Sequence, residues 1–435
     1  MNTRTLRIII LTALIVRVAM LAAVWNRPGR CYTPDSEAYI KLAQSLIENG
    51  SFAQDGSAEI FRTPGYPLFL AFGAPFGENW WQAVIILQVV LDVALTYLVF
   101  LLGWMLVGQR TGLWAALFYA ISPLAIAASV RILSDSLFTF LITLSLLLVV
   151  FQIKSGRWWA LVAAACAMGA ACYVRPVGLV VAVICAAGLL AGCRKAAQTG
   201  VFVGIVALIV FPWVIRNSAS AQYWGFSSFA GDSVYFFAVP EVMSAKEGIP
   251  AAEARDRMRE ADARDNAWLS PGLAAKARAR EARQTIAENP RLYAWIHLKG
   301  CLGFFLPGAG DLLEVSGFTA GNMGTIDVLH REGLVAAVKH FFKGNVFAAA
   351  LAAPLIAVLA AQYLGAVLCI IRRGSLHMPA EIWLLAAVFI MAILLPGPFG
   401  LPRYRLPVAP LLCVAAVAGF VAKGKTVASG MKEQP

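Results

Sequence analysis

Long, uninterrupted apolar segments dominate this chain of 435 residues and limit what it can fold into. Several reach the roughly 20 residues that an α-helix needs to cross the hydrocarbon core of a bilayer. Hydrophobic residues make up 60% of the sequence and charged residues 14%, with a mean hydropathy of +0.72, whereas soluble proteins contain about 25% charged residues. The segments lack the apolar and polar alternation of barrel strands. The sequence therefore predicts an all-α, polytopic membrane protein that forms a single membrane-embedded domain.

Ten segments of this kind are expected to cross the membrane. They cover residues 8–25, 81–107, 112–129, 134–153, 158–174, 177–192, 199–215, 346–371, 380–396 and 406–422. A cleaved signal peptide is the alternative for the first segment, because a basic start precedes an apolar run with small residues near its end. Arg17 interrupts that run, so we interpret it as the first membrane helix.

The loops between these segments differ in charge, and this difference predicts their orientation, since short cytoplasmic loops are enriched in Lys and Arg. One side carries most of the excess positive charge, on Arg4, Arg7, Arg110, Lys154, Arg157, Arg194, Lys195, Arg372, Arg373, Lys423, Lys425 and Lys432. Both termini are therefore assigned to the cytoplasm. The rest of the chain is nearly neutral, so the net charge of +12 indicates membrane topology and gives no sign of a nucleic-acid partner.

Two long segments, residues 26–80 and 216–345, fall on the opposite side, where function is usually carried. Hydrophobic spacing and turn signals predict short helices there, at residues 39–48, 251–268 and 270–289. Residues 291–306 mix aromatic, apolar and basic side chains and fit an amphipathic segment at the membrane interface, with an eleventh crossing as the alternative.

Asp35 follows the first membrane segment by a short linker and precedes an expected helix. Asp is a common helix N-cap, so capping is one interpretation of this residue. A carboxylate at the outer surface of the bilayer is also where a general base would meet a membrane-bound substrate. The sequence leaves both interpretations open.

Arg62 begins the segment Arg-Thr-Pro-Gly-Tyr-Pro-Leu-Phe-Leu, in which two prolines and a glycine fix a turn before an apolar half-helix. The guanidinium lies at membrane level on the side where positive charge is disfavoured. Cations in such positions commonly neutralise a negative group.

Further arginines are predicted at the same outer boundary, at Arg131, Arg175, Arg216, Arg403 and Arg405. A single arginine there is ordinarily a snorkelling anchor. Several that converge would form a cationic pocket suited to phosphate. Asp135 opens the fourth segment from the same side, where it could cap the helix, pair with Arg131 or hold a cation.

Arg17 and Asp92 fall near the middle of the first two segments, and intramembrane charges usually pair. We expect a structural ion pair between them. The cysteines and histidines lack the spacing of metal ligands, so no metal site is predicted. Cys31 and Cys301 alone are expected outside the cytoplasm, and whether they form a disulfide is left open.

These motifs resemble the GT-C superfamily of glycosyltransferases, and in particular bacterial enzymes that use polyprenyl-phosphate sugars, of the protein O-mannosyltransferase and aminoarabinose transferase type. The resemblance rests on Asp35, the Arg-x-Pro-Gly-Tyr-Pro segment, Tyr-Val-Arg-Pro, Pro-Trp-Val-Ile-Arg-Asn and Arg-Tyr-Arg-Leu-Pro-Val, which occur in this order. It implies a bacterial inner-membrane enzyme of the cell envelope, with an extracytoplasmic active site and a role in modifying lipopolysaccharide or polysaccharide.

The resemblance also implies roles for individual residues. Asp35 would be the catalytic base, and donor phosphate would bind to Arg62, Arg175, Arg216, Arg403 and Arg405. Accessory positions would be Glu59, Tyr66, Arg131, Asp135 and Tyr404. No cofactor is assigned from these residues, and a divalent cation at the donor phosphate stays an open alternative.

The predicted activity is sugar transfer, with inversion, from a polyprenyl (undecaprenyl) phosphate donor to a hydroxyl of a lipid, glycan or protein acceptor. The Asp-Glu doublet of eukaryotic protein mannosyltransferases is absent, because Ser36 separates Asp35 from Glu37. The alternative is a transporter or flippase for lipid-linked saccharides. Transporters place ionisable residues near the midplane, where this sequence offers only Arg17 and Asp92.

Overall fold

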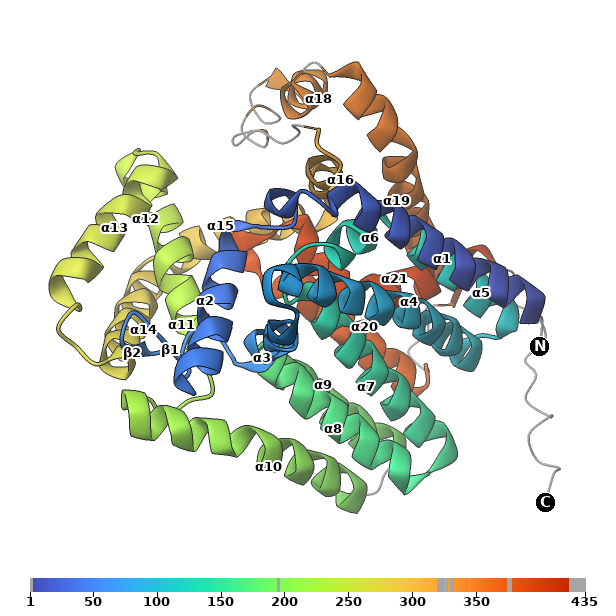
Figure 1. The fold of residues 1–435 in the computed structure, drawn as a ribbon, viewed down its shortest axis with the longest axis horizontal. Helices are drawn as coiled ribbons and strands as arrows, with labels where there is room; N and C mark the ends of the chain where they lie inside the picture. The colour runs from blue at the N-terminus through green and yellow to red at the C-terminus, as the bar shows by residue number, and fades with distance from the viewer. Residues whose placement is uncertain are drawn as a thin grey trace.

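The computed structural model describes residues 3–193, 196–318, 325, 328, 332–343, 345–373 and 378–421. This part of the chain is almost entirely helical, as predicted (Figure 1). The apolar helices are α1 (Thr3–Val24), α4 (Trp80–Leu106), α5 (Gln109–Ala120), α6 (Pro123–Ser129), α7 (Asp135–Ser155), α8 (Trp158–Val174), α9 (Gly178–Cys193), α10 (Ala196–Ala221), α19 (Val346–Arg373), α20 (Ala380–Leu394) and α21 (Ala409–Phe420).

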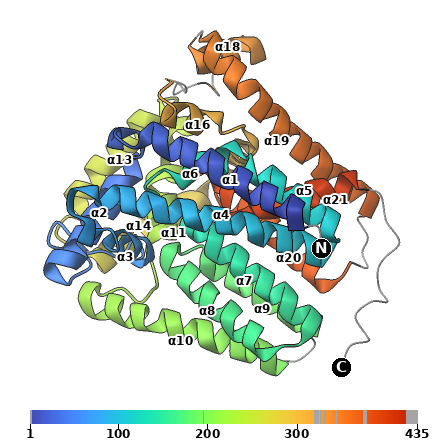
Figure 2. The ribbon, with the colours of Figure 1, turned by 45° about the vertical axis from the view of Figure 1, so that its right-hand side comes forward.

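Each predicted membrane segment overlaps one or two of these helices. Six helices in the described part are long and apolar enough to cross a bilayer, and α8, α9 and α20 are shorter apolar helices. The helices α1, α4, α7, α8 and α10 pack one against the next across the bundle (Figure 2). A multi-pass membrane protein follows from these lengths and compositions.

The third predicted segment, residues 112–129, differs from a continuous crossing. It consists of α5 and α6, whose axes are bent by 59° relative to each other. Ser122 has an extended backbone and Pro123 begins α6; proline lacks the N–H that a continuous helix would need there. Because the whole stretch is apolar, its composition predicted one continuous crossing and gave no sign of the break.

The remaining elements connect the apolar helices. They are α2 (Pro34–Asn49), α3 (Gly65–Ala71), α11 (Phe229–Ser233), α12 (Val239–Glu247), α13 (Ala251–Asp265), α14 (Pro271–Glu288), α15 (Pro290–Cys301), α16 (Ala309–Val315) and α18 (Leu334–Phe342), with 3₁₀ segments that include η4 (Leu302–Phe305) and η6 (Pro402–Val408). In Figure 1, α2 and α11 to α14 gather at the end of the bundle away from the N-terminus. The helices predicted at 39–48, 251–268 and 270–289 correspond to α2, α13 and α14.

Two expectations about the loops are refined. Residues 291–306 form α15 and η4, which are not among the helices of the described part that are long and apolar enough to cross a bilayer. A small antiparallel hairpin, β1 (Ala53–Gln54) and β2 (Ser57–Ala58), was not predicted. Asp55 and Gly56 connect its strands with positive φ angles of 52° and 77°, and Asp-Gly is a typical sequence for such a turn.

A buried ion pair joins the first helices of the bundle. Nε of Arg17 lies 2.5 Å from Oδ2 of Asp92, and both side chains are almost fully buried. Arg17 also donates to the backbone carbonyl of Ala120 at 2.6 Å, and the Tyr119 hydroxyl donates to Oδ1 of Asp92 at 2.7 Å. The pair therefore connects α1, α4 and α5, and it places the charges inside the bundle, as expected.

Part of the predicted topology signal lies outside the described residues. Arg194, Lys195, Lys423, Lys425 and Lys432 belong to this group. Cys31 and Cys301 both lie in the described part, and both are buried free thiols.

Candidate active site

The first residues of α2 position Asp35. Thr33 is the N-cap and forms a capping box with Ser36, whose hydroxyl accepts from the Thr33 N–H at 2.8 Å. Asp35 is the second residue of the helix, so it is not the N-cap. Its carboxylate is left to contact other side chains, and 38% of the side chain is exposed.

The start of α2 is docked against the segment that precedes α7. The Ser36 hydroxyl donates to the carbonyl of Ile132 at 2.7 Å, and the Ile132 N–H donates to the carbonyl of Cys31 at 2.9 Å. These bonds hold the start of α2, which carries Asp35, against the segment that leads into α7 at Asp135.

The turn that carries Arg62 is held by local hydrogen bonds. Oε1 of Glu59 accepts from the N–H groups of Phe61 and Arg62 at 2.5 and 2.9 Å. The Tyr66 hydroxyl donates to the buried side chain of Gln88 at 2.8 Å. Glu59 and Tyr66 therefore support the backbone of the turn, and their side chains contribute to the site by fixing Arg62.

Gly65 in this turn allows α3 to approach the end of α8. A Cβ at this position would lie 2.6 Å from the backbone carbonyl carbon of Tyr173, well inside van der Waals contact. Gly65 is three residues after Arg62 and Tyr173 is two residues before Arg175, so this close packing joins the backbone segments that carry the two arginines.

Asp35 lies between two arginines. Its Oδ1 is 3.3 Å from Nη2 of Arg62, and its Oδ2 is 2.9 Å from Nη1 of Arg403. The Arg62 guanidinium also lies over the ring of Tyr39, at 5.1 Å from its centroid. Three elements distant in sequence, α2, the turn before α3 and η6, therefore meet at one carboxylate.

A second carboxylate, that of Asp135, interacts electrostatically with Arg403, the arginine that pairs with Asp35. Oδ2 of Asp135 is 2.9 Å from Nη2 of Arg175, and Nε of Arg175 donates to Oγ of Ser134 at 2.9 Å. The Asp135 side chain is only 3% exposed, and its Oδ1 has no hydrogen-bond partner among the described residues. Asp135 pairs with Arg175, and the alternative pairing with Arg131 is not formed.

The charges of this cluster determine how Asp35 ionises. Burial raises the pKa of the Asp35 carboxyl, but Arg403, Arg62 and Arg175 together lower it further, and the net effect is a pKa below the ordinary value of 3.8. The carboxylate is therefore ionised at neutral pH. We call Asp35, Asp135, Arg62, Arg175 and Arg403 the carboxylate–arginine cluster.

Arg131 belongs to an adjoining contact. It forms ion pairs with Asp311, at 3.3 Å, and with Glu314, both on α16. These two acidic residues were not predicted as site residues, although an acidic pair three positions apart within an apolar helix of 309–315 is a detectable signal. Tyr404 lies beside Arg403, whose guanidinium carbon is 5.5 Å from the centre of its ring.

Arg216 lies on α10, and its guanidinium binds the backbone of the first loop, residues 26–80. It donates to the backbone carbonyls of Glu59, at 2.7 Å, and Phe52. Its guanidinium carbon is 4.7 Å from the centre of the Trp213 ring. These contacts hold residues 52–59 against α10, and the binding of phosphate by Arg216 stays a prediction.

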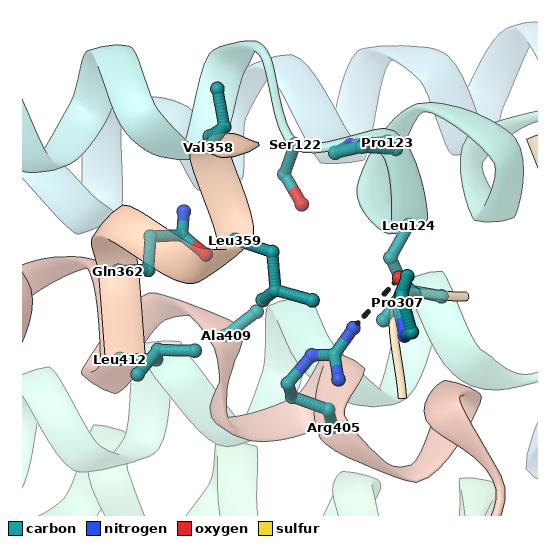
Figure 3. Close-up of a pocket in the computed structure, with 10 residues that line it drawn as sticks. All are labelled: Ser122, Pro123, Leu124, Pro307, Val358, Leu359, Gln362, Arg405, Ala409 and Leu412. Atoms are coloured by element: carbon teal, nitrogen blue, oxygen red, sulfur yellow. Dashed lines mark hydrogen bonds between the residues drawn. The ribbon is translucent and has the colours of Figure 1, made fainter. Parts of the chain in front are cut away.

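Arg405 is buried among backbone carbonyls. It donates to the carbonyls of Phe304, Leu306 and Pro307 at 2.6, 2.9 and 3.2 Å. Figure 3 shows its guanidinium directed at Pro307, beside a cavity of 20 Å³, a volume on the order of a single water molecule. Its contacts hold residues 304–307, and a role in phosphate binding likewise stays a prediction.

The cluster offers a cationic site with an ionised carboxylate at its centre. Among the residues that the structure describes, no group of three or more His, Cys, Asp or Glu side chains is arranged to hold a metal ion. The cationic side chains of the cluster are Arg62, Arg175 and Arg403, and arginine N–H groups bind carboxylate and phosphate with directed hydrogen bonds.

Comparison with a protein-family model identifies the central part of the chain. Residues 62–215 match the family of dolichyl-phosphate-mannose-protein mannosyltransferases. This range begins at Arg62 and includes Asp135 and Arg175. A search of curated proteins found no match.

Solved structures identify the fold. An oligosaccharyltransferase from Archaeoglobus fulgidus, tethered to an acceptor peptide, is 15% identical with a TM-score of 0.54, over 96% of this chain and 49% of that chain. The oligosaccharyltransferase AglB from the same organism, in complex with an inhibitory peptide and a dolichol-phosphate, is 15% identical with a TM-score of 0.51, over 94% and 49%. The chain thus spans about half the length of these enzymes.

A weaker similarity is found to ArnT from Cupriavidus metallidurans bound to undecaprenyl phosphate, with 16% identity and a TM-score of 0.44, over 96% of this chain and 78% of that chain. The helical fold is thus similar to that of the two oligosaccharyltransferase structures with TM-scores above 0.5. Residues 62–215 match the model of the dolichyl-phosphate-mannose-protein mannosyltransferase family, and both findings agree with the predicted GT-C resemblance.

Proposed function

We propose that this protein transfers a sugar from a polyprenyl monophosphate donor to an acceptor hydroxyl at the outer face of a bacterial inner membrane, with both termini in the cytoplasm. The observation that carries the proposal is the position of Asp35 between Arg62 and Arg403. The family description names a dolichyl-phosphate sugar, and the similarly folded AglB was solved with dolichol-phosphate; both support a polyprenyl-phosphate donor.

In this mechanism Asp35 is the general base. It accepts the proton of the acceptor hydroxyl while the hydroxyl oxygen bonds to the anomeric carbon. The bond from that carbon to the phosphate oxygen breaks, and its electron pair stays on the phosphate. Because one nucleophile displaces one leaving group directly, the anomeric configuration is inverted.

The lowered pKa of Asp35 is compatible with this role. The proton of an alcohol becomes strongly acidic only as its oxygen bonds to the electron-poor anomeric carbon, so a weak base suffices late in the reaction. Arg62, Arg175 and Arg403 would meanwhile stabilise the charge that grows on the leaving phosphate. Arginines already fixed in place do this without reorganisation in the transition state.

A transporter or flippase receives no support from the charged residues inside the bundle. Arg17 and Asp92 neutralise each other and are almost fully buried. The charges available to a phosphate lie instead around Asp35. The acceptor would be a lipid, a glycan or a protein, and membrane lipids would surround the donor chain.

The proposal is tested with the purified full chain in lipid nanodiscs. A radiolabelled polyprenyl-phosphate sugar is supplied with an extract of envelope lipids and glycans, and labelled acceptor and released polyprenyl phosphate are both measured. The proposal requires release of polyprenyl phosphate by the wild type and loss of this release in Asp35→Asn. Equal release by the wild type and the variant would refute it.

A further inference from the structure

The carboxylate–arginine cluster has a feature that general base catalysis does not need. The two guanidinium groups that face Asp35, those of Arg62 and Arg403, are engaged with its two oxygen atoms. Each guanidinium contacts Asp35 through one nitrogen, so a phosphate that binds the same two groups must share them with the carboxylate. The carboxylate of Asp35 and the phosphate therefore compete for the positive charge of the same two arginines.

From this geometry we infer that Asp35 has a second function: after each transfer its re-ionised carboxylate competes with the product phosphate for Arg62 and Arg403 and so promotes product release. This inference rests on the proposed function, because it requires a polyprenyl monophosphate product. It adds a role for Asp35 in the step that follows chemistry.

Charge balance explains why release would need such a competitor. The donor is a phosphodiester with a single negative charge, and the product is a monoester whose second pKa is near 6 and which carries close to two charges at neutral pH. The transferred proton neutralises Asp35 at the same moment. The total charge of the site is unchanged by the reaction, so the doubly charged product is held by arginines that no longer have a carboxylate partner.

Loss of the proton from Asp35 reverses this situation. The ionised carboxylate then lies beside the product phosphate, and like charges that share the same two arginines repel each other. The carboxylate needs no diffusion to compete, because α2 holds it next to both guanidinium groups. An internal competitor of this kind weakens the product complex in every cycle.

Asp135 is unsuited to the same function. Its side chain is 3% exposed and one of its oxygens contacts Arg175 at 2.9 Å. Asp35 is 38% exposed, so its proton can pass to water and an incoming phosphate can displace it. We therefore assign Asp135 as the constant partner of Arg175 and Asp35 as the exchangeable partner of Arg62 and Arg403.

The test measures binding of the product-like anion farnesyl phosphate to the full-length protein in nanodiscs at pH 7.5. Asp35→Asn removes the competing charge and keeps the shape of the side chain. We expect it to bind farnesyl phosphate about tenfold more tightly than the wild type, since bonds between arginine and an ionised group are strong. Asp35→Ser provides a second variant, with the same expectation, if the first folds poorly.

The matched control is Glu37→Gln. It removes the same amount of charge from the same helix, but Glu37 pairs with Lys41 at 2.8 Å and has no contact with Arg62 or Arg403. Its affinity for farnesyl phosphate should stay within about twofold of the wild type, since exposed charges interact weakly. Equal tightening in Glu37→Gln and Asp35→Asn would overturn the inference, as would unchanged or weaker binding in both Asp35 variants.

Two further variants separate this inference from the proposed function. Arg62→Gln and Arg403→Gln should each weaken farnesyl phosphate binding. If neither does, the phosphate site of the proposed function is wrong. If both do while the Asp35 variants bind no more tightly than the wild type, the phosphate site stands and only the competition is refuted.

Discussion

Nη1 of Arg403 lies 2.9 Å from Oδ2 of Asp35, although the two residues belong to opposite ends of the chain. One follows the first membrane helix and the other precedes the last described one. Their contact brings η6 against the start of α2, and the proposed mechanism gives each residue a distinct role. Asp35 would handle the proton of the acceptor, and Arg403 would handle the charge of the phosphate.

The catalytic role proposed for Asp35 predicts a specific defect in Asp35→Asn. Transfer should fall by about 100-fold or more, because the amide cannot accept the proton. The thermal midpoint should change little, because Thr33 and Ser36 supply the cap of α2. Transfer to a fixed acceptor and thermal unfolding are measured on the same preparation, with Glu37→Gln as the control. If folded Asp35→Asn transferred sugar at a rate within about threefold of the wild type, Asp35 would not be the catalytic base.

The charges around Asp35 predict the pH dependence of kcat/KM, which reports the free enzyme. A base is active when ionised, so activity is lost as the pH falls through its pKa. Because the arginines hold the pKa of Asp35 below 3.8, the wild type should show no acid limb above about pH 4 with an acceptor that does not titrate. Arg403→Gln removes the largest lowering influence and should move the limb to higher pH. An acid limb near pH 6 in the wild-type profile would contradict a base with a lowered pKa.

Arg405 is predicted to be important for stability. Its guanidinium donates to three backbone carbonyls and to the Tyr363 hydroxyl. Replacing it with Met leaves these buried acceptors without a donor, at about 1 to 3 kcal/mol for each unsatisfied group. The thermal midpoint of Arg405→Met should therefore fall strongly. The midpoint of Arg403→Met should stay closer to that of the wild type, because its partner Asp35 is partly exposed. If Arg405→Met were stable but bound the donor more weakly, Arg405 would be a phosphate-binding residue, and its stabilising role would be refuted.

The contrast between these two arginines shows what the sequence could predict. Arg403 and Arg405 lie in one motif at the same predicted boundary, and both were expected to bind phosphate. Their different surroundings depend on residues 304–307, whose carbonyls face Arg405. Backbone carbonyls have no signature in the sequence, so the partner of a buried arginine is visible only after the chain has folded.

Other features were predictable because they depend on local composition or on pairing rules. The apolar segments follow from hydropathy, and the partnership of Arg17 with Asp92 follows from the cost of isolated charge in the bundle. The break between α5 and α6 depends on one proline within an apolar run. Asp135 could be placed at the start of a helix, but the choice of Arg175 over Arg131 depends on the packing of α7 against α8.

The Arg17–Asp92 pair predicts non-additive effects on folding. Removing one partner leaves a buried charge without its counter-ion, which costs about 3 to 5 kcal/mol, whereas removing both partners costs less. Arg17→Leu and Asp92→Leu should each lower the yield of folded protein more than the double variant does. Yield is measured by size-exclusion chromatography of detergent extracts. Losses in the double variant equal to the sum of the single losses would show that the pair is not coupled.

The last prediction concerns Gly65, whose close packing joins the segments that carry Arg62 and Arg175. The added Cβ of Gly65→Ala would lie 2.6 Å from the backbone of Tyr173, and neither backbone can move away without displacing α3 or the end of α8. Overpacking of this kind costs about 1 to 3 kcal/mol. The thermal midpoint should fall, and KM for the donor should rise because Arg62 shifts relative to Arg175. Gly200→Ala on α10 is the matched control, since nothing lies within 4 Å of a Cβ there and alanine favours a helix. Wild-type stability and donor KM in Gly65→Ala would show that the close contact does not determine the site.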